Sequence, residues 1–330
     1  MRKEILFAIL AGALFGLIIA FGIWRLNSTL SPSDQSSTEA SPTPSTEFRI
    51  TIAKPEKYQV LTESPYTISG ITKENAWVVI SGEEEDYVTQ ANLGGTFEID
   101  VELAGGANQI IISAFDENGA MVEENLILVY STEFPTEEVT KEEENNTDST
   151  DSSDIREKVQ EKVKLAQTVP FSYIGTVTDI TEDTIQLRAL TGEIKQASVE
   201  NDAEYINQTG STSKKINFKD VAIGDFIIAM GFKNGQEVLS TKRLLVTTAL
   251  ESPTRKAVFG KVKSFEGKVL TVESSGTETE ITFPKTWKGP EIDEIDIDAD
   301  IIVVYSTDTG KNTTRTVHLP SSEQPSLLEQ

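Results

Sequence analysis

Acidic side chains are the most abundant reactive groups of this chain, and one run of them alternates with isoleucine near the C-terminus. The carboxylates of this run are Glu291, Asp293, Glu294, Asp296, Asp298 and Asp300. Clustered carboxylate oxygens suit Ca²⁺, but an EF-hand loop starting at Asp296 would place Ile301 at its glycine and Thr307 at its bidentate glutamate. That loop type is therefore excluded. The alternation instead predicts a solvated acidic face without a metal, with the neighbouring isoleucines pointing mostly inward, namely Ile292, Ile295, Ile297 and Ile301.

A second acidic group, from Glu83 to Asp86, lies between two strand-like segments and is predicted to be the acidic tip of a hairpin. The chain has 53 acidic residues, so their number alone does not exclude a pair of carboxylates placed for glycoside hydrolysis. Small sandwiches and barrels with short loops, however, offer no evident deep cleft. We therefore expect a protein that is not an enzyme, and a weak hydrolase using acids near Trp287 remains the alternative.

Nucleophilic and metal-dependent chemistry lacks its usual residues. His318 is the only histidine, and the chain contains no cysteine. A Ser-His-Asp triad or a zinc-bound water therefore has no plausible set of side chains, and disulfides and thiolate ligands are impossible. We expect His318 to be a bystander and predict no cofactor.

Aromatic rings are the remaining candidates for ligand contact, because exposed rings stack on the faces of sugars. The notable ones outside the N-terminal apolar segment are Trp77, Trp287, Tyr58, Tyr66, Tyr87 and Tyr205. Trp287, in the loop-like residues 284–290, is the candidate for ligand stacking, although a core role covering a sheet edge fits equally well. Trp77 is predicted to be the buried tryptophan of a sandwich.

The first 26 residues predict a transmembrane anchor. Arg2 and Lys3 precede an apolar run over residues 5–24, which Arg25 closes. A helix of that length, at about 1.5 Å per residue, crosses the roughly 30 Å hydrocarbon core. The basic residues predict an N-terminus in the cytoplasm and the bulk of the chain outside it, in contact with membrane lipid through residues 5–24. A cleaved signal peptide, with Ala20 and Gly22 before the cleavage site, is the alternative.

Small residues recur every four positions along this predicted span. They are Ala8, Gly12, Gly16 and Ala20. Such a stripe lets two helix backbones approach closely, so it predicts a homodimer through the transmembrane helix or docking to another membrane protein. Gly and Ala are frequent in membrane helices in any case, which is the alternative explanation.

The rest of the chain divides by composition. Residues 27–47 form a Ser/Thr/Pro-rich spacer, residues 132–153 an acidic linker, residues 154–167 a short helix opened by Asp154 with Glu157, and residues 321–330 a disordered tail. The net charge of −24 and a pI near 4.4 repel nucleic acid, so no nucleic-acid partner is expected.

Period-two patterns over residues 48–131 predict a β-sandwich. The predicted strands are residues 49–52, 67–69, 76–81, 87–91, 97–101, 109–115 and 125–130. A tight turn is expected at Gly105 and Gly106 with Asn108, and a second from Asp116 to Gly119. This region resembles the bacterial immunoglobulin-like domains of the glucodextranase B-domain type through Gly95, Thr96, Phe97, Leu103, Gly106, Asn108, Ile110, Ile112, Ala114, Asp116 and Gly119.

An internal repeat predicts two further β-domains, over residues 168–249 and 250–320. Residues 173–177 and 184–187 correspond to 258–262 and 269–272, and residues 224–228 correspond to 299–303, with Ala299 in place of the turn glycine Gly224. Each copy then ends in a strand, at residues 240–246 and 314–319. The pattern resembles the OB-like five-stranded modules of bacterial envelope proteins.

The fold class predicted from these features is mainly β, with an N-terminal transmembrane helix, an Ig-like sandwich, a short helix and two small OB-like barrels in tandem. The predicted function is binding or scaffolding at the cell envelope, with a wall glycan or another envelope protein as partner and two flexible linkers that hold the domains near the membrane. Alternatives are a carbohydrate-binding accessory and a subunit of a membrane complex docked through the transmembrane helix.

Overall fold

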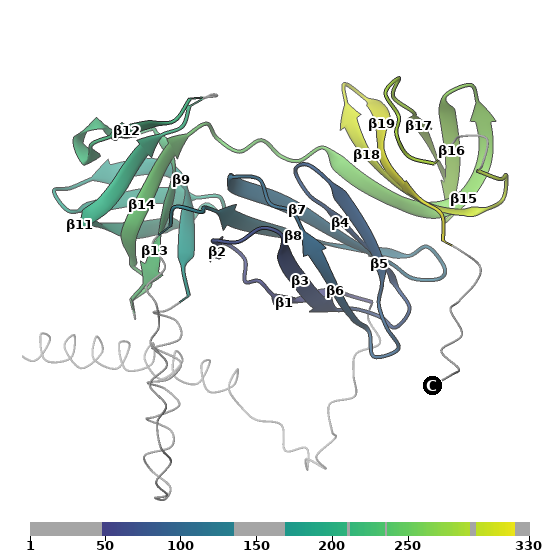
Figure 1. The fold of residues 1–330 in the computed structure, drawn as a ribbon, viewed down its shortest axis with the longest axis horizontal. Coiled ribbons are helices and arrows are strands. Elements are labelled where there is room, and N and C mark those ends of the chain that lie inside the picture. Colours follow the sequence, from purple (N-terminus) through teal and green to yellow (C-terminus); the bar gives the residue numbers. More distant parts are fainter. Residues whose placement is uncertain (1–47, 135–168, 210–211, 235, 291–294, 321–330) are drawn as a thin grey trace, which may run out of the picture. The chain divides into compact units, whose positions relative to one another are not determined.

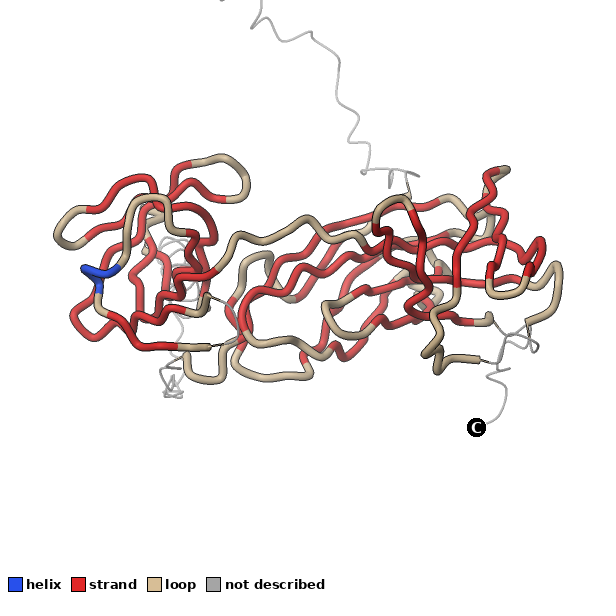
Figure 2. The backbone as a smooth tube through the Cα atoms, turned by 90° about the horizontal axis from the view of Figure 1, so that it is seen from above, coloured by secondary structure: helices blue, strands red, loops and turns tan. Residues whose placement is uncertain are grey.

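The computed structural model describes residues 48–134, 169–209, 212–234, 236–290 and 295–320, and this part of the chain is mainly β (Figures 1 and 2). Its single short helix is the 3₁₀ turn η1 (Phe218–Asp220). Within those ranges no helix has the length and hydropathy of a membrane span. The predicted span and its small-residue stripe, the spacer, the 154–167 helix and the tail lie outside the described residues, as does most of the acidic linker.

Residues from Phe48 onward form a two-sheet sandwich. Its strands are β1 (Thr51–Lys54), β2 (Val60–Leu61), β3 (Tyr66–Ile71), β4 (Trp77–Ser81), β5 (Asp86–Gln90), β6 (Thr96–Val101), β7 (Gly106–Phe115) and β8 (Met121–Tyr130). One sheet has the order β1-β3-β6 and the other β2-β8-β7-β4-β5. All seven predicted strands are present. The strand β2 was not predicted, because two residues are too few to show a period-two pattern.

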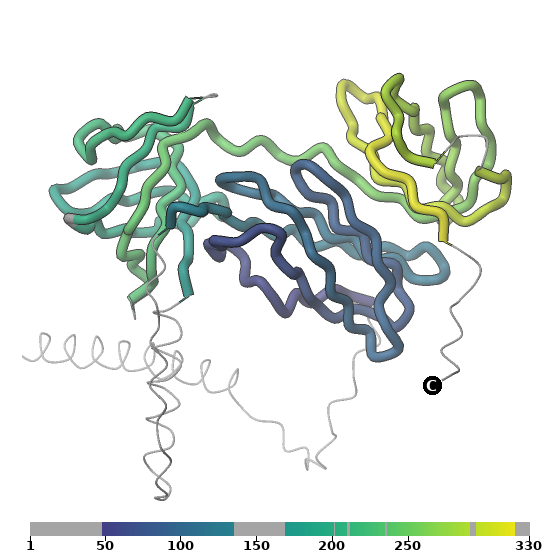
Figure 3. Tube along the Cα trace, viewed as in Figure 1, coloured from purple at the N-terminus to yellow at the C-terminus, as the bar shows by residue number. Residues whose placement is uncertain are grey.

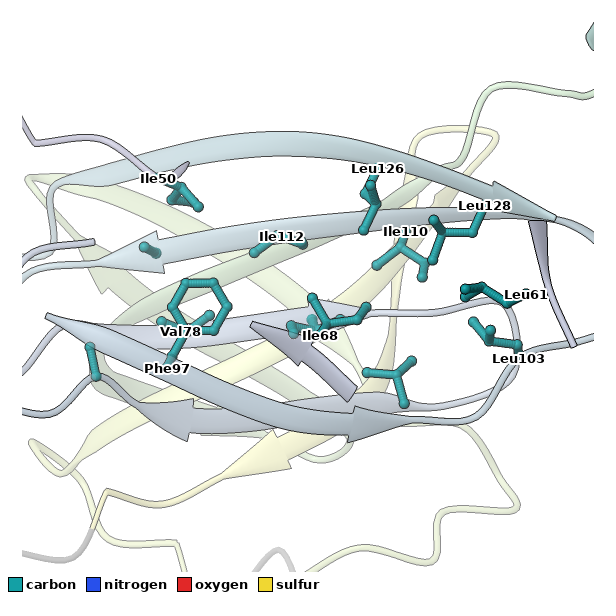
Figure 4. Packing of buried hydrophobic residues seen from close by; sticks show 14 residues of the cluster. Ile50, Leu61, Ile68, Val78, Phe97, Leu103, Ile110, Ile112, Leu126 and Leu128 are labelled. Carbon is teal, nitrogen blue, oxygen red and sulfur yellow. The ribbon is translucent and has the colours of Figure 1, made fainter. Parts of the chain in front are cut away.

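The sandwich core lies between these sheets, as Figure 4 shows. Alternation places Ile110 and Ile112 on the inner face of β7, where they meet Ile68 and Phe97 of the opposite sheet. The predicted turn before β7 is held by Asn108, whose Oδ1 accepts from the Ala104 N–H and whose Nδ2 donates to the Ala104 and Gly106 carbonyls.

The sequence repeat corresponds to two barrels with the same ring of strands. The first barrel contains β9 (Phe171–Ile180), β10 (Thr184–Ala189), β11 (Ile194–Asn207), β12 (Lys214–Ile216), β13 (Phe226–Lys233) and β14 (Leu239–Thr247). The second contains β15 (Arg255–Glu266), β16 (Val269–Ser274), β17 (Thr277–Thr282), β18 (Asp300–Asp308) and β19 (Lys311–His318). Figure 3 traces both copies along the chain.

Pairing runs β9-β10-β11-β14-β13 and back to β9 in the first copy, and β15-β16-β17-β19-β18 and back to β15 in the second. In each ring one neighbouring pair is parallel, β11 with β14 and β17 with β19, and the others are antiparallel. This is the order of an OB-like barrel.

The repeated glycine of each copy has a steric reason. A Cβ at Gly175 would lie 2.0 Å from the Arg188 carbonyl oxygen, and one at Gly260 would lie 2.1 Å from that of Glu273. Both glycines therefore let β9 and β15 coil tightly against the next strand of their ring.

The predicted alignment of the repeats at their second turn is wrong by one residue. Gly224 donates its N–H to the Val177 carbonyl, and Asp298 makes the same bond to Val262. Both residues have positive φ, 97° and 64°. The turn glycine is thus replaced by Asp298 and not by Ala299, and aspartate is among the side chains that tolerate this conformation best.

The acidic run near Asp298 follows the predicted alternation only in part. Ile295 and Ile301 are buried, but Ile297, which was predicted to point mostly inward, is 55% exposed. It directly precedes the left-handed Asp298, where the backbone turns and regular alternation stops. Ile292 lies outside the described residues.

Candidate functional site

Phe48–Gln330 forms one compact unit, and within it the sandwich contacts both barrels. Its contact with the first barrel, named the first interface, has an apolar core of Val60, Val129, Phe134, Ile174, Ile228, Met230 and Leu245. The main chain joins as well, because the Val60 N–H donates to the Pro170 carbonyl at 3.0 Å and the Ser172 N–H donates to the Tyr58 carbonyl at 2.8 Å. The start of β9 thus pairs with the segment that contains β2.

A buried arginine closes the first interface. Arg243 on β14 donates to the Glu204 carboxylate at 2.8 Å and also binds the carboxylate of Glu133, which follows the last sandwich strand. Its side chain is only 7% exposed, and its Nε has no partner among the described residues. A buried guanidinium needs such carboxylates to offset its desolvation.

The contact of the sandwich with the second barrel, named the second interface, uses the outer face of β4 and β7. Val79 and Phe115 pack there against Phe259, Ile302 and Val304. The rings of Phe115 and Phe259 lie 6.2 Å apart in an edge-to-face arrangement. The sandwich core and this second-interface cluster therefore cover opposite faces of the same sheet.

The predicted acidic hairpin tip is part of this second interface. Glu83 accepts from Arg255 at 2.8 Å, and Asp86 accepts from Arg315 at 3.1 Å and from the Thr316 hydroxyl at 2.9 Å. The Asp86 side chain is 1% exposed. The interpretation as a simple acidic tip is therefore wrong for these two acids, because basic residues far along the chain neutralise them.

Trp77 and His318 also lie at the second interface. Their rings are 5.2 Å apart, and Trp77 packs beside the cluster around Phe115 instead of in the sandwich core. The prediction of a buried sandwich tryptophan is thus wrong, because Trp77 points away from the face that Val78 and Ile80 occupy.

The residues of β4 and β7 indicate this interface already in the sequence, because they depart from strict alternation. In β4 the residues Val78, Val79 and Ile80 are all buried, and in β7 burial continues from Ile110 to Phe115. Consecutive apolar residues in a strand indicate that both faces are covered. A sandwich with one solvated sheet face would show strict alternation instead.

The aromatic pocket lies at one end of the first barrel. It has a volume of about 140 Å³ and is lined by Tyr58, Phe171, Ser172, Tyr173, Ile174, Ala189, Thr191, Glu193, Lys195 and Lys233. Phe171 contacts Tyr58 and Tyr173 edge-to-face, with ring centroids 6.3 Å and 6.0 Å away. Tyr58 is contributed by the sandwich and the other residues by the barrel.

Charged groups surround the mouth of the aromatic pocket. The Lys233 ammonium lies 3.4 Å from the Phe171 ring centroid, and Lys195 lies 5.9 Å from that of Tyr173. Lys195 pairs with Glu193 at 2.9 Å and Lys233 with Glu237 at 3.5 Å. The hydrogen bond from Lys195 holds the pKa of Glu193 below its usual value, so this carboxylate is ionised at neutral pH.

Tyr173 closes the inner end of the pocket. Burial, with a smaller contribution from the charge of Glu237, raises the pKa of Tyr173 to about 12. Its hydroxyl therefore stays protonated and donates to the Glu237 carbonyl oxygen. The inner wall is neutral, whereas the mouth carries two ion pairs.

Trp287, the predicted stacking residue, lies elsewhere, in the second barrel. Its ring meets Phe283 edge-to-face with centroids 5.0 Å apart, and its indole N–H donates to the Pro290 carbonyl at 2.8 Å. The side chain is half-buried and belongs to the edge of the barrel core. The sequence left two roles open for Trp287, ligand stacking and packing over a sheet edge. This geometry favours the packing role.

A larger hollow of about 690 Å³ lies along the segment that joins the barrels. It is lined by polar residues, among them Gln109, Gln208, Thr248, Ser252, Thr254 and Arg255. Among the residues that the structure describes, no group of three or more potential metal ligands converges there or elsewhere. The aromatic pocket brings three aromatic rings together with charged and polar groups. Trp287 lines a separate hollow of about 360 Å³ with Lys288, Thr314, Arg315 and Thr316.

Comparisons with known proteins assign no family. No protein-family model and no curated protein matches the chain, whereas 12 chains of solved structures do. One is a multidomain protein with nucleic acid binding domains from Streptococcus pneumoniae TIGR4, at 13% identity and a TM-score of 0.16. That match covers 46% of this chain and 46% of the streptococcal chain, less than half of either.

Two further matches are adhesins. A tetra-tandem repeat from the extending region of a large adhesion protein is 12% identical over 84% of this chain and 74% of its own, with a TM-score of 0.22. A Ca²⁺-stabilised adhesin that helps an Antarctic bacterium bind ice is 18% identical over 82% and 72%, with a TM-score of 0.18. TM-scores this low carry no argument about function.

Proposed function

We propose that this protein is a membrane-anchored, extracytoplasmic binding or scaffolding protein of the cell envelope, without catalytic activity. The observation that carries the proposal is the pair of interfaces that join the sandwich to both barrels through apolar clusters and neutralised arginines. Domains fixed in this way can present a binding surface at a constant orientation, which lowers the entropy lost when a partner binds.

The anchor in this proposal is the apolar segment at residues 5–24, and the spacer at residues 27–47 separates it from the compact unit. The predicted tethering changes in one respect. The proposed tethering does not include flexibility between the sandwich and the first barrel. The segment that contains β2 and the start of β9 bind each other directly. The partner would be a wall glycan or another envelope protein, held at high effective concentration.

A carbohydrate-binding accessory is the second candidate, and the aromatic pocket favours it. Three ring edges and several hydrogen-bonding groups converge on a hollow of about 140 Å³. Sites for small polar ligands commonly combine an apolar wall with a few placed polar groups.

The test is capture by the soluble 48–330 fragment, offered in parallel to the purified cell wall and the membrane proteins of its host. Saturable binding to the wall, or capture of one defined membrane protein, is the expected result. Hydrolysis of wall glycan by the fragment would contradict the non-catalytic role. Binding to neither preparation would contradict the scaffolding role of the compact unit.

A further inference from the structure

The aromatic pocket at the end of the first barrel has a size and composition that restrict its ligand. We propose that it is a subsite for a single neutral pyranose ring of a glycan chain. The proposal rests on the extracytoplasmic binding role and adds the ligand class and the residues. The volume of about 140 Å³ is well below the roughly 300 Å³ at which pockets for whole small molecules begin. One sugar ring therefore enters, and the rest of the chain stays outside.

The walls fit the apolar faces of such a ring. Phe171 and Tyr58 are half-buried, whereas Tyr173 and Ile174 are buried beneath them. The C–H groups of a pyranose contact aromatic rings favourably, and its hydroxyls lie around the edge of the ring. Such a ligand needs an apolar wall and a polar rim at the same site.

The rim supplies both hydrogen-bond donors and acceptors. Lys195 and Lys233 offer ammonium donors, Glu193 a carboxylate acceptor, and the Thr191 hydroxyl acts as either. An apolar peptide side chain would cover these groups without satisfying them, which costs free energy. Sugar hydroxyls satisfy both kinds.

Charge balance favours a neutral sugar. At the mouth of the pocket, Lys195 is paired with Glu193 and Lys233 with Glu237, so the local charges cancel. The chain as a whole carries −24, which disfavours an acidic glycan. A neutral ligand keeps both ion pairs intact.

Tyr58 is held rigidly in a conformation that a non-glycine residue seldom adopts. Its φ is 69°. Its N–H donates to the Ile127 carbonyl at 2.6 Å, and its own carbonyl accepts from both the N–H and the hydroxyl of Ser172, each at 2.8 Å. Such backbone conformations cluster at binding sites, where neighbouring contacts maintain them. The backbone that carries the Tyr58 ring is thus held in place at the pocket by three hydrogen bonds.

The experiment titrates the full chain, reconstituted in nanodiscs, with neutral tetrasaccharides of glucose and of N-acetylglucosamine, by saturation-transfer NMR and calorimetry. Tyr58→Gly removes the ring and keeps a residue that accepts positive φ, and Lys233→Met removes the ammonium but keeps an apolar stem. Each is expected to weaken binding about tenfold. Lys242→Met, on the same barrel but paired with Asp202 at 3.2 Å, is the matched control and should bind like the parent.

Two outcomes overturn the proposal: no binding of either tetrasaccharide by the parent protein, or unchanged affinity in both pocket variants while their melting temperatures stay normal. Stronger binding of an apolar peptide, or of an acidic tetrasaccharide, at the same residues overturns the choice of ligand. If the subsite fails but the 48–330 fragment still captures the wall or a membrane protein, the proposed function stands. If sugar binding persists without either capture, the proposed function fails instead.

Discussion

At the scale of single residues, His318 makes the second interface sensitive to pH. Burial against Trp77 lowers the pKa of His318 below its ordinary value of 6.5. A group whose pKa is depressed on folding adds stability that is complete above the unfolded value and lost as the pH falls through the folded value. We therefore expect the free energy of unfolding to decrease as the pH falls below 6.5, as measured by urea denaturation at pH 7 and at pH 5.5.

The control is His318→Gln, which removes the only histidine of the chain. Carboxyl groups titrate mainly below about pH 5, so the change in this interval belongs to the imidazole. Equal pH dependence in the parent and the variant would refute the assignment. NMR titration of the imidazole gives the folded pKa directly, and a value above 6.5 would contradict the predicted direction.

Trp287 gives a second prediction at this scale. Trp287→Ala removes an edge-to-face contact with Phe283 and a hydrogen bond to Pro290. Because the side chain is only half-buried, we expect a loss of about 2 kcal/mol in unfolding free energy, below the range for a fully buried tryptophan. Urea denaturation measures it, with exposed Thr286→Ala as the control. A stable variant that loses wall binding would restore Trp287 as a ligand contact.

At the scale of elements, the repeated glycines decide whether each barrel closes. Gly175→Ala and Gly260→Ala each place a Cβ about 2 Å from a backbone carbonyl oxygen, which cannot move as a side chain can. We expect losses of about 3 kcal/mol or more, measured by denaturation. Gly105→Ala, where a Cβ meets nothing within 4 Å, should differ from the parent by well under ~1 kcal/mol. Equal stability of the three variants would refute the steric explanation.

Much of this element structure was predictable because local patterns determine it. The seven sandwich strands follow from period-two alternation, and the order of the barrel strands repeats because the sequence repeats. The one-residue error at the second turn arose because Asp298 adopts a backbone conformation that a search for glycine overlooks.

The contacts between elements were far less predictable. Tyr58 and Phe171 are far apart in the sequence but lie together in the aromatic pocket. The main-chain bridge between Gln59 and Phe171 brings them there. The acids Glu83 and Asp86 have the composition of an exposed turn, and only the tertiary fold brings Arg255 and Arg315 to them. Composition predicts exposure, but it does not identify a distant partner.

At the scale of the whole molecule, the second interface is expected to make the sandwich and the second barrel unfold together. Its polar part lies within the compact unit, where Asp86 binds Arg315, Thr316 and the Ser81 hydroxyl. Two domains joined by an interface of this kind should give one cooperative transition. Their separation would appear as a second transition.

Arg315→Ala tests this coupling. It leaves the Asp86 carboxylate buried with only hydroxyl partners and removes the bond to the Gly82 carbonyl. Breaking a buried ion pair on one side costs about 3 kcal/mol, so we expect the second barrel to melt earlier and calorimetry to show two transitions. The control is Lys261→Ala, which removes an exposed pair with Asp300 on the same barrel and should cost less than ~1 kcal/mol. A single unshifted transition in Arg315→Ala would mean that the apolar cluster around Phe115 holds the two domains without help from the charges.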